Sequence, residues 1–307
     1  MTVHRPVRLQ LRNWQLFALA VLVWGTTWHA IVYQLAETTP EFGVALRFGV
    51  AGAGVLAWCA WRGERLRVTA RDHARLALQG VFMYSVSYLC VYHAENHVPS
   101  GLVAVGYSAS PLILGVAARL LFGTPLTRRL AIGGAMGLAG VTLIFWPEFA
   151  RMRSDASTAL GAAFTVGAVL LSAVGSLIAS RNRSSGLAFW PALGYGMAYS
   201  SLVSWLFVFA SGQALHWPTA LSWWLSFAYL TAFGSVVAFA CYLLLQQRIG
   251  LGPAATVGVA TPVIALAVST AFEGYRPDLM TVLGVALAIA GNLLVLGLGF
   301  RRKAAVP

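Results

Sequence analysis

Ten apolar stretches, each long enough to cross a lipid bilayer as an α-helix, occupy most of this chain of 307 residues. They run over roughly residues 14–36, 42–61, 75–94, 99–120, 130–147, 158–180, 187–211, 222–247, 253–272 and 278–299. A helix needs about 20 mainly apolar residues to cross the hydrocarbon core, and only helices and closed barrels satisfy their backbone hydrogen bonds there. The loops are short. The sequence therefore predicts an all-α polytopic membrane protein with ten transmembrane helices and no soluble module.

The composition excludes several other classes of protein. Hydrophobic residues make up 59% of the chain and charged residues only 10%, against about 25% charged residues in a soluble domain. The net charge of +12 could suggest a nucleic-acid partner. However, the basic residues stand singly or in short groups between apolar spans rather than in one patch. We therefore expect membrane lipids around the chain and no nucleic acid.

Reactive side chains are sparse. The only lysine is Lys303, so a retinal Schiff base within the membrane is excluded, and any P-loop would lack its lysine. Cys59, Cys90 and Cys241 lie in apolar spans without paired spacing, which indicates neither a disulfide framework nor a zinc site. The spans hold no evident pair of nucleophile and base. We expect no cofactor, no metal site and no enzyme activity.

The arginines predict the orientation. If the N-terminus is cytoplasmic, then of the 21 Lys and Arg residues only Arg151, Arg153 and Arg276 lie outside, and Arg47 lies within a span. Positive residues concentrate on the cytoplasmic side of membrane proteins. Both termini are therefore predicted to be cytoplasmic, in the inner (plasma) membrane of a bacterium.

The two halves of the chain repeat one plan. Residues 99–147, moved forward by 151 positions, align without a gap on a second copy. The matched residues are Gly101 with Gly252, Pro111 with Pro262, Gly123 with Gly274, Gly133 with Gly284, and Gly140 with Gly291. Residues 1–150 and 151–307 are then two repeats of five spans each. An odd number of spans makes the copies inverted, so the 123–129 loop is inside and its counterpart 274–280 is outside. Inverted repeats are typical of secondary transporters.

Polar and aromatic residues within the first and third spans are candidates for a substrate-binding cavity. Polar groups in lipid are costly unless they face protein or water. In the first span these candidates are Trp24, Thr27, Trp28 and His29; in the third they are Tyr84 and Tyr88, four residues apart. Such tyrosines suit an apolar or aromatic solute with a polar end. The alternative is structural: Gly25 packs on a neighbouring helix and His29 bonds a backbone carbonyl.

The second set of candidates lies in spans four, eight and nine. Tyr107 and Ser108 precede Pro111, and the equivalent Pro262 follows Thr261. Proline inside a helix frees a carbonyl group and kinks the helix. Matched kinks in the two repeats point to moving elements beside a binding site, although each could be a static packing feature. In span eight, Ser235, Phe239 and Tyr242 lie along one face.

Charged groups near the membrane are few. Arg47, a few residues into span two, could attract a carboxylate, or it could reach the interface or pair with an acid in a loop. Glu95 is expected outside, and no acidic residue is expected deep in a span, which argues against organic cations as the main cargo. His93 and His97 have the spacing of two metal ligands. Without a third ligand they are interpreted as part of a solvated loop.

The sequence resembles the EamA family of the drug/metabolite transporter superfamily over nearly its whole length. The residues that carry the resemblance are Trp24-Gly25, Arg47-Phe48, Tyr242 through Gly250, Ala254-Ala255, and Pro262 on to Gly291. The glycine-glutamate turn usual after spans four and nine is altered, because Thr124 follows Gly123, and Glu273 precedes Gly274. Within the family it is most similar to the aromatic amino acid exporter (YddG-like) branch.

This resemblance implies an exporter of small metabolites that alternates between inward- and outward-open states around a central cavity. Aromatic residues without deep acids suit amino acids, aromatic ones included. The alternatives are an exporter of lipophilic drugs or nucleosides and, from a different class, a passive channel. We expect a monomer or weak dimer.

Overall fold

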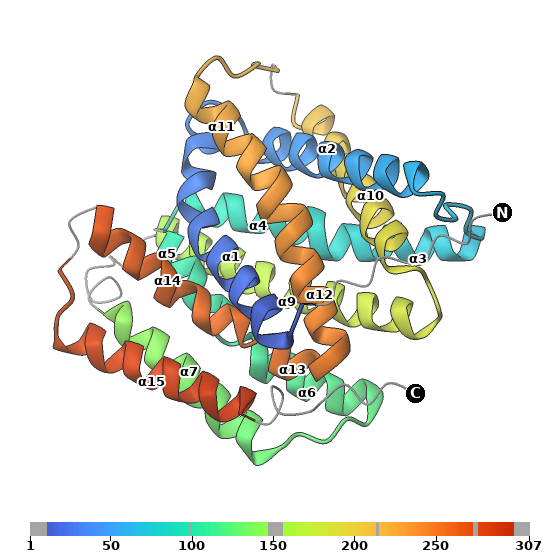
Figure 1. Cartoon of the computed structure of the whole chain (residues 1–307). Helices are drawn as coiled ribbons and strands as arrows, with labels where there is room; N and C mark the ends of the chain where they lie inside the picture. The colour runs from blue at the N-terminus through green and yellow to red at the C-terminus, as the bar shows by residue number, and fades with distance from the viewer. Residues whose placement is uncertain (1–10, 99, 147–155, 213–214, 273–275, 298–307) are drawn as a thin grey trace.

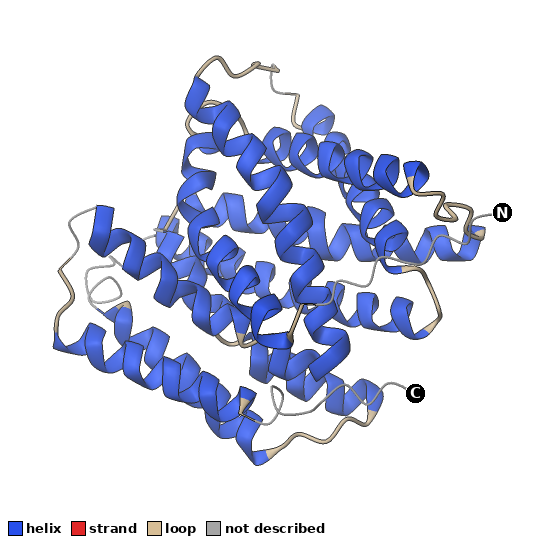
Figure 2. Cartoon of the chain, viewed as in Figure 1, coloured by secondary structure: helices blue, strands red, loops and turns tan. Residues whose placement is uncertain are grey.

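The computed structural model describes residues 11–98, 100–146, 156–212, 215–272 and 276–297 (Figure 1). Within these ranges every regular element is a helix and no strand occurs (Figure 2). The helices of the first half are α1 (Asn13–Leu35), α2 (Pro40–Trp61), α3 (Ala70–Gly80), η1 (Val81–Ser85), α4 (Val86–Glu95), α5 (Ser100–Tyr107), α6 (Ser110–Phe122) and α7 (Arg128–Ile144). Those of the second half are α9 (Ala156–Ser184), α10 (Phe189–Ala210), α11 (Leu221–Tyr229), η2 (Leu230–Val237), α12 (Ala238–Ile249), α13 (Leu251–Ala254), α14 (Val257–Phe272) and α15 (Leu279–Leu296).

The predicted class is confirmed as an all-helical polytopic membrane protein. Among the described residues, 9 helical spans are long and apolar enough to cross a membrane. The remaining predicted span corresponds to α7, which has 17 residues. The largest boundary error is at the third span, expected from residue 75. There α3 begins at Ala70, because helical hydrogen bonding continues into a polar first turn that a search for apolar residues misses.

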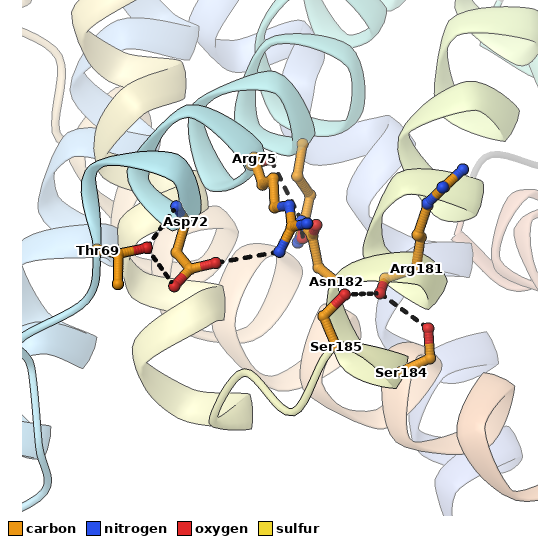
Figure 3. Close-up of polar contacts among 8 residues, drawn as sticks. Thr69, Asp72, Arg75, Arg181, Asn182, Ser184 and Ser185 are labelled. Carbon is orange, nitrogen blue, oxygen red and sulfur yellow. Dashed lines mark hydrogen bonds and ion pairs between the residues drawn. The ribbon is translucent and has the colours of Figure 1, made fainter.

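Polar contacts fix the start of α3 against the end of α9 (Figure 3). The side chain of Thr69 accepts from the backbone N–H of Asp72 at 3.2 Å, and Asp72 pairs with Arg75 at 3.2 Å. From α9, the Asn182 amide donates to the Arg75 carbonyl at 3.2 Å and to the Gln79 side chain at 3.0 Å. Such contacts satisfy helix-end groups that have no intrahelical partner.

Helices α7 and α15 lie side by side (Figure 1) and cross through the glycines of the repeat. A methyl group on Gly133 would lie 2.6 Å from the backbone oxygen of Gly291, and one on Gly291 would lie 2.5 Å from that of Gly133. Gly140 and Gly284 face each other in the same way, at 2.6 Å in both directions. The repeat matches Gly133 with Gly284 and Gly140 with Gly291, so it exchanges the two contacts. Two copies related by a two-fold axis have this property.

Helices α2 and α10 form a second close pair. A methyl group on Gly52 would lie 2.6 Å from the backbone nitrogen of Ala198 and 2.9 Å from the carbonyl oxygen of Gly194. Nearby, the Ser201 hydroxyl donates to the Ala45 carbonyl at 2.7 Å. Small residues allow such approach where lipid supplies no hydrophobic force between helices.

The third and eighth spans each contain a π-helical segment. Moving η1 forward by 151 positions gives residues 232–236, which lie inside η2. A π-helical turn leaves carbonyl groups without their usual partners and is frequent at functional sites. One of these carbonyls, of Gly234, accepts from the indole N–H of Trp24 in α1 at 3.1 Å. The two π-segments therefore mark equivalent places in the two repeats.

The fourth and ninth spans are broken, but not at equivalent residues. The fourth is interrupted between α5 and α6, and Pro111 lies in the first turn of α6. The ninth is interrupted between α13 and α14, and Pro262 lies inside α14. Two matched kinks were expected, but Pro111 lies at the start of a helix and Pro262 lies within a continuous helix. Their roles as hinges stay predictions.

The glycine contact between α7 and α15 gives a first prediction. Gly140→Ala should lower the thermal stability of the purified protein by about 1–3 kcal/mol, because the added methyl group meets backbone atoms that cannot rotate away. Fluorescence-detected thermal denaturation in detergent measures the effect. Gly54→Ala is the matched control, because nothing lies within 4 Å of its Cβ position. Equal melting of the two variants would contradict this account of the interface.

Candidate functional site

A cavity of about 90 Å³ lies in the centre of the bundle, bordered by α1, α4, α9, α12 and the broken fourth and ninth spans. Aromatic and small side chains dominate its wall, with a few hydroxyl groups and one guanidinium group. The lining residues from the first repeat are Trp24, Thr27, Trp28, Ile31, Arg47, Met83, Tyr88, Val91, Tyr107, Ser110 and Leu114. Those from the second are Ser172, Ala173, Ser176, Phe239, Tyr242, Ala255, Gly258 and Thr261.

Several lining residues are partners in the 151-residue repeat. The pairs are Tyr88 with Phe239, Val91 with Tyr242, Tyr107 with Gly258, and Ser110 with Thr261. The cavity therefore lies where equivalent segments of the two copies face each other. Binding sites of transporters built from inverted repeats occupy this position.

Edge-to-face aromatic contacts build one wall. The Trp24 ring centre lies 5.0 Å from that of Phe239 and 5.2 Å from that of Tyr242. Across the cavity Trp28 lies 6.0 Å from Tyr107. Such contacts hold flat apolar surfaces in fixed orientation.

Arg47 supplies the positive charge of the site. Its side chain is only 1% exposed. Its Nε donates to the Ser235 hydroxyl at 2.8 Å, and its Nη1 donates to the Tyr92 hydroxyl at 3.3 Å. The guanidinium carbon also lies 5.0 Å from the centre of the Tyr88 ring. No hydrogen bond links Nη2 to a described residue, although a methyl group on Gly234 would lie 3.0 Å from it.

A second tier of contacts orients this guanidinium group. The Tyr92 hydroxyl, which accepts from Arg47, donates to the Gln34 side chain at 2.6 Å. Tyr92 and Gln34 are both 0% exposed. A buried charge needs hydrogen-bonding partners to offset its lost hydration. Ser235, Tyr92 and Gln34 therefore hold Arg47 at the cavity without neutralising it.

Further polar groups border the cavity. The hydroxyl groups of Tyr107 and Ser172 are hydrogen-bonded at 3.1 Å. The Trp28 indole nitrogen is buried and has no hydrogen-bond partner among the described residues. The site thus combines hydroxyl groups, one unused indole N–H and one guanidinium group in an aromatic surround.

The structure brings together most of the predicted site residues. Those that line the cavity are Trp24, Thr27, Trp28, Arg47, Tyr88, Tyr107, Phe239 and Tyr242. Gly25 packs closely on the neighbouring helix α14, as the structural alternative for this cluster predicted, since a methyl group on Gly25 would lie 2.6 Å from the Ile264 side chain.

Four other candidates lie outside the cavity wall. His29 is exposed beside Tyr33, whose hydroxyl is 3.3 Å away. Tyr84 is 0% exposed and packs behind the wall, 4.7 Å from the Phe239 ring. Ser108 donates to the carbonyl of Val105. Ser235 supports Arg47 and does not line the cavity.

His93 and His97 have separate partners, the Glu41 carboxylate and the Ser157 hydroxyl. The described residues contain no group of three or more His, Cys, Asp or Glu side chains placed to hold a metal ion. His93 lies in α4, and its Nε2 is 2.8 Å from the Glu41 carboxylate of α2. Its ring stacks on Phe164 of α9 at 5.2 Å. The expectation of a solvated loop is wrong for His93, because packing against α9 extends the helix past it.

Sequence reasoning missed Ser172 and Ser176 of α9. They are four residues apart in an otherwise apolar span, so they share one helix face. That spacing was the available signal. Gln34 was also missed, and a lone amide near a helix end offers little signal by itself.

Comparison with known proteins also divides the chain into two similar halves. The model of the EamA-like transporter family matches residues 14–146 and again residues 159–297. A solved crystal structure superposes with a TM-score of 0.76 over 94% of this chain and 99% of its own, at 19% identity, which supports the fold alone.

Curated relatives are similar over nearly the full length. The uncharacterized inner membrane transporter YedA of Escherichia coli (strain K12) is 28% identical over 291 residues, covering 91% of this chain and 89% of that protein. A probable terminal-alkyne amino-acid exporter of Streptantibioticus cattleyicolor is 27% identical over 319 residues, covering 98% of this chain and 99% of that protein.

The hydrogen-bond chain behind Arg47 gives a second prediction. Tyr92→Phe should lower the stability of the folded protein by about 1–3 kcal/mol, because the buried Gln34 oxygen and Arg47 Nη1 each lose the hydrogen bond to the Tyr92 hydroxyl. Thermal denaturation in detergent measures the loss. The control is Tyr33→Phe, which removes the hydroxyl of an exposed tyrosine and should change stability by less than about 0.5 kcal/mol. If both variants melt like the wild type, the buried chain contributes nothing to stability.

Proposed function

The chain belongs to the EamA-like transporter family, and we propose that it exports amino acids or related small metabolites, aromatic amino acids included, across the bacterial inner membrane. The family consists of transporters, so the chain is a membrane transporter and not an enzyme. Similarity to the inner membrane transporter of Escherichia coli supports this choice of membrane. Similarity to the probable amino-acid exporter of Streptantibioticus supports this class of cargo.

The observation that carries this proposal is Arg47 in an aromatic cavity. A guanidinium group binds a carboxylate through two parallel N–H donors. Arg47 uses Nε and one Nη1 hydrogen for Ser235 and Tyr92, which leaves Nη2 for a carboxylate of the cargo. The binding of a carboxylate would also offset the cost of the buried positive charge.

The rest of the cavity suits the other parts of an amino acid. Trp24, Trp28 and Tyr88 offer flat surfaces for an aromatic or large apolar side chain. The hydroxyl groups of Ser172 and Tyr107 add hydrogen-bonding groups to the wall. The cavity of about 90 Å³ is smaller than the roughly 300–1,000 Å³ of ordinary ligand pockets. Its walls must therefore separate to admit such a cargo, as alternating access requires.

The helix irregularities support that movement. Met83 of η1, and Ser110 and Ala255 beside the two helix breaks, line the cavity. Segment η2 bonds two of the lining residues, Trp24 and Arg47. Non-helical backbone at this depth is tolerated where it borders a cavity, and such segments accompany the motion of one repeat against the other.

Two alternatives to amino-acid export are distinguished by the experiment below. A lipophilic drug or nucleoside would use the same aromatic walls without needing Arg47. A passive channel would use the same helices without changing state.

Transport by purified protein in liposomes tests the proposal. Phenylalanine or tryptophan should cross faster than in empty liposomes, and the rate should saturate with concentration. Competition by unlabelled nucleosides or lipophilic cations distinguishes the other cargo classes. An ohmic current in a bilayer recording would indicate a channel. No flux for these or other neutral amino acids would reject amino-acid export.

Arg47 substitutions give a sharper prediction. Arg47→Gln should lower amino-acid flux at subsaturating concentration by about tenfold or more, the loss expected when a charged hydrogen bond to the cargo is removed. Arg47→Lys should retain part of the flux, since it keeps the charge but not the paired donors. Arg62→Gln is the control, because Arg62 lies over Trp58 at the end of α2 and away from the cavity. Normal flux in a correctly inserted Arg47→Gln variant would remove Arg47 from the site.

A further inference from the structure

Glu95 is a buried carboxyl group without a hydrogen-bond partner. It is the last residue of α4 and ends the membrane-length helical run Ala70–Glu95. Both carboxyl oxygens are shielded from solvent, and neither bonds to any described residue. Glu95 lies at the end of its span, as expected for a residue predicted to be near the outer side, but its carboxyl group is buried within the protein.

The position follows from the helix geometry. Glu95 lies one turn beyond Val91, which lines the cavity, and three residues after Tyr92, which bonds Arg47. Residues spaced by three or four share a helix face. Glu95 therefore lies on the same face of α4 as Val91 and Tyr92, one turn nearer the end of the helix that is predicted to face the outside.

The charged and titratable groups around Glu95 are few. Arg47 of α2 and Tyr92 of α4 itself interact with it electrostatically. Glu41 of α2 is occupied by its 2.8 Å contact with His93.

The other helices packed on α4 add little charge at this end. On α1 the titratable side chains are His29 and Tyr33, both on the exposed surface. Segment η1 contributes only Tyr84, on the far side of Tyr88. α5 holds none apart from Tyr107 at its inner end. In α9 the charged residues, Arg181 and Arg183, lie at the opposite end.

An isolated carboxylate is costly in such a place. Burying an ionised group without a partner raises the free energy by several kcal/mol, so the group must bind a proton or a cationic partner. The position therefore favours one of two states: a neutral carboxylic acid, or a carboxylate paired with a positive group that enters the cavity.

The repeat shows that this property belongs to one end of the protein only. Moving Glu95 forward by 151 positions gives Gln246 of α12. Gln246 is also buried, at 7% exposure, and its Nε2 also lacks a partner among the described residues. The two side chains are isosteric and occupy equivalent places in the two repeats, each one turn beyond a residue that lines the cavity. Only the one at the predicted outer end can bind and release a proton.

We propose that Glu95 is the coupling site of the transporter, where a proton is exchanged for the ammonium group of an amino acid whose carboxylate is bound by Arg47. The inference rests on the proposed amino-acid export. Facing the cytoplasm, the Glu95 carboxylic acid releases its proton to water, and the carboxylate accepts hydrogen bonds from the cargo ammonium group. Facing outside, the cargo leaves and the carboxylate takes a proton from the outside medium.

The cycle exchanges one cargo molecule for one proton. One zwitterion leaves the cell for each proton that enters, and one positive charge moves inward. The proton gradient of the bacterial membrane then drives export. Because a proton and an ammonium group cannot occupy the carboxylate together, the two cargoes compete.

The test uses the full chain in liposomes with phenylalanine inside and out at equal concentration. A pH difference of one unit, with the membrane potential clamped at zero, should drive an approximately tenfold gradient of phenylalanine for one proton exchanged. A pH-sensitive dye inside the liposomes should report protons moving in the opposite direction. Glu95→Gln should form no gradient of phenylalanine, whatever rate of phenylalanine exchange it retains.

The matched control is Glu41→Gln. It changes a carboxylate at the same end of the protein that already has a partner, so the gradient of phenylalanine should still form. If the wild type equilibrates phenylalanine without responding to pH, or if Glu95→Gln still forms the gradient, the coupling site is wrong and amino-acid export stands. If the wild type passes no amino acid, both proposals fall together.

A second measurement tests Glu95 without transport. Infrared difference spectra of the purified protein should show a protonated carboxylic acid that loses its proton when phenylalanine is added, and Glu95→Gln should lack this signal. An unchanged signal in Glu95→Gln would assign it to another group and overturn the proposal.

Discussion

The fold depends on one constraint: a backbone polar group inside the bilayer must find its hydrogen-bond partner within the protein. Continuous helices meet this constraint unaided, and the described spans are continuous except around the cavity. There the π-segments and helix breaks free carbonyl groups, and other helices supply the missing donors. The Trp24 indole N–H bonds the Gly234 carbonyl at 3.1 Å. Irregular helical segments are therefore tolerated where the two repeats meet, because side chains from other helices can bond their backbone groups there.

Close packing extends the same logic between the copies. The contact of Trp24 with Gly234 joins the first and eighth spans, and its counterpart under the 151-residue offset joins Gly175 with Met83. A methyl group on Gly175 would lie 2.6 Å from the Met83 Cβ. A large residue faces a glycine in both contacts, but the large residue is on α1 in one and on the third span in the other. Both contacts thus place a large residue against a glycine, but the large residue and the glycine change places between the repeats. The side chains that surround the cavity therefore differ between the two repeats.

The sequence was sufficient for the spans, because length and apolar composition depend on the bilayer and not on the neighbours of a helix. It also located most of the aromatic wall, since Tyr88 and Phe239 lie on equivalent faces of repeated helices. It failed for Tyr84, which four-residue spacing placed on the face of Tyr88. Tyr84 lies within η1, where the wider π-turn rotates it out of that register. The burial of the Glu95 carboxyl group was not predicted, because an acidic residue at the end of a span resembles a loop residue until the surrounding helices are known to bury it.

The asymmetry between the copies gives the molecule its direction. A transporter with two identical halves would favour neither of its two states, since each state is the other turned over. Here the charged groups break that equality, because Arg47 corresponds to Ala198 and Glu95 to Gln246 under the offset. Both residues lie in the first repeat. In the proposed cycle, protonation of Glu95 and binding of the cargo at Arg47 therefore act on one repeat only, and they shift the balance between two states that the symmetric scaffold would leave similar in energy.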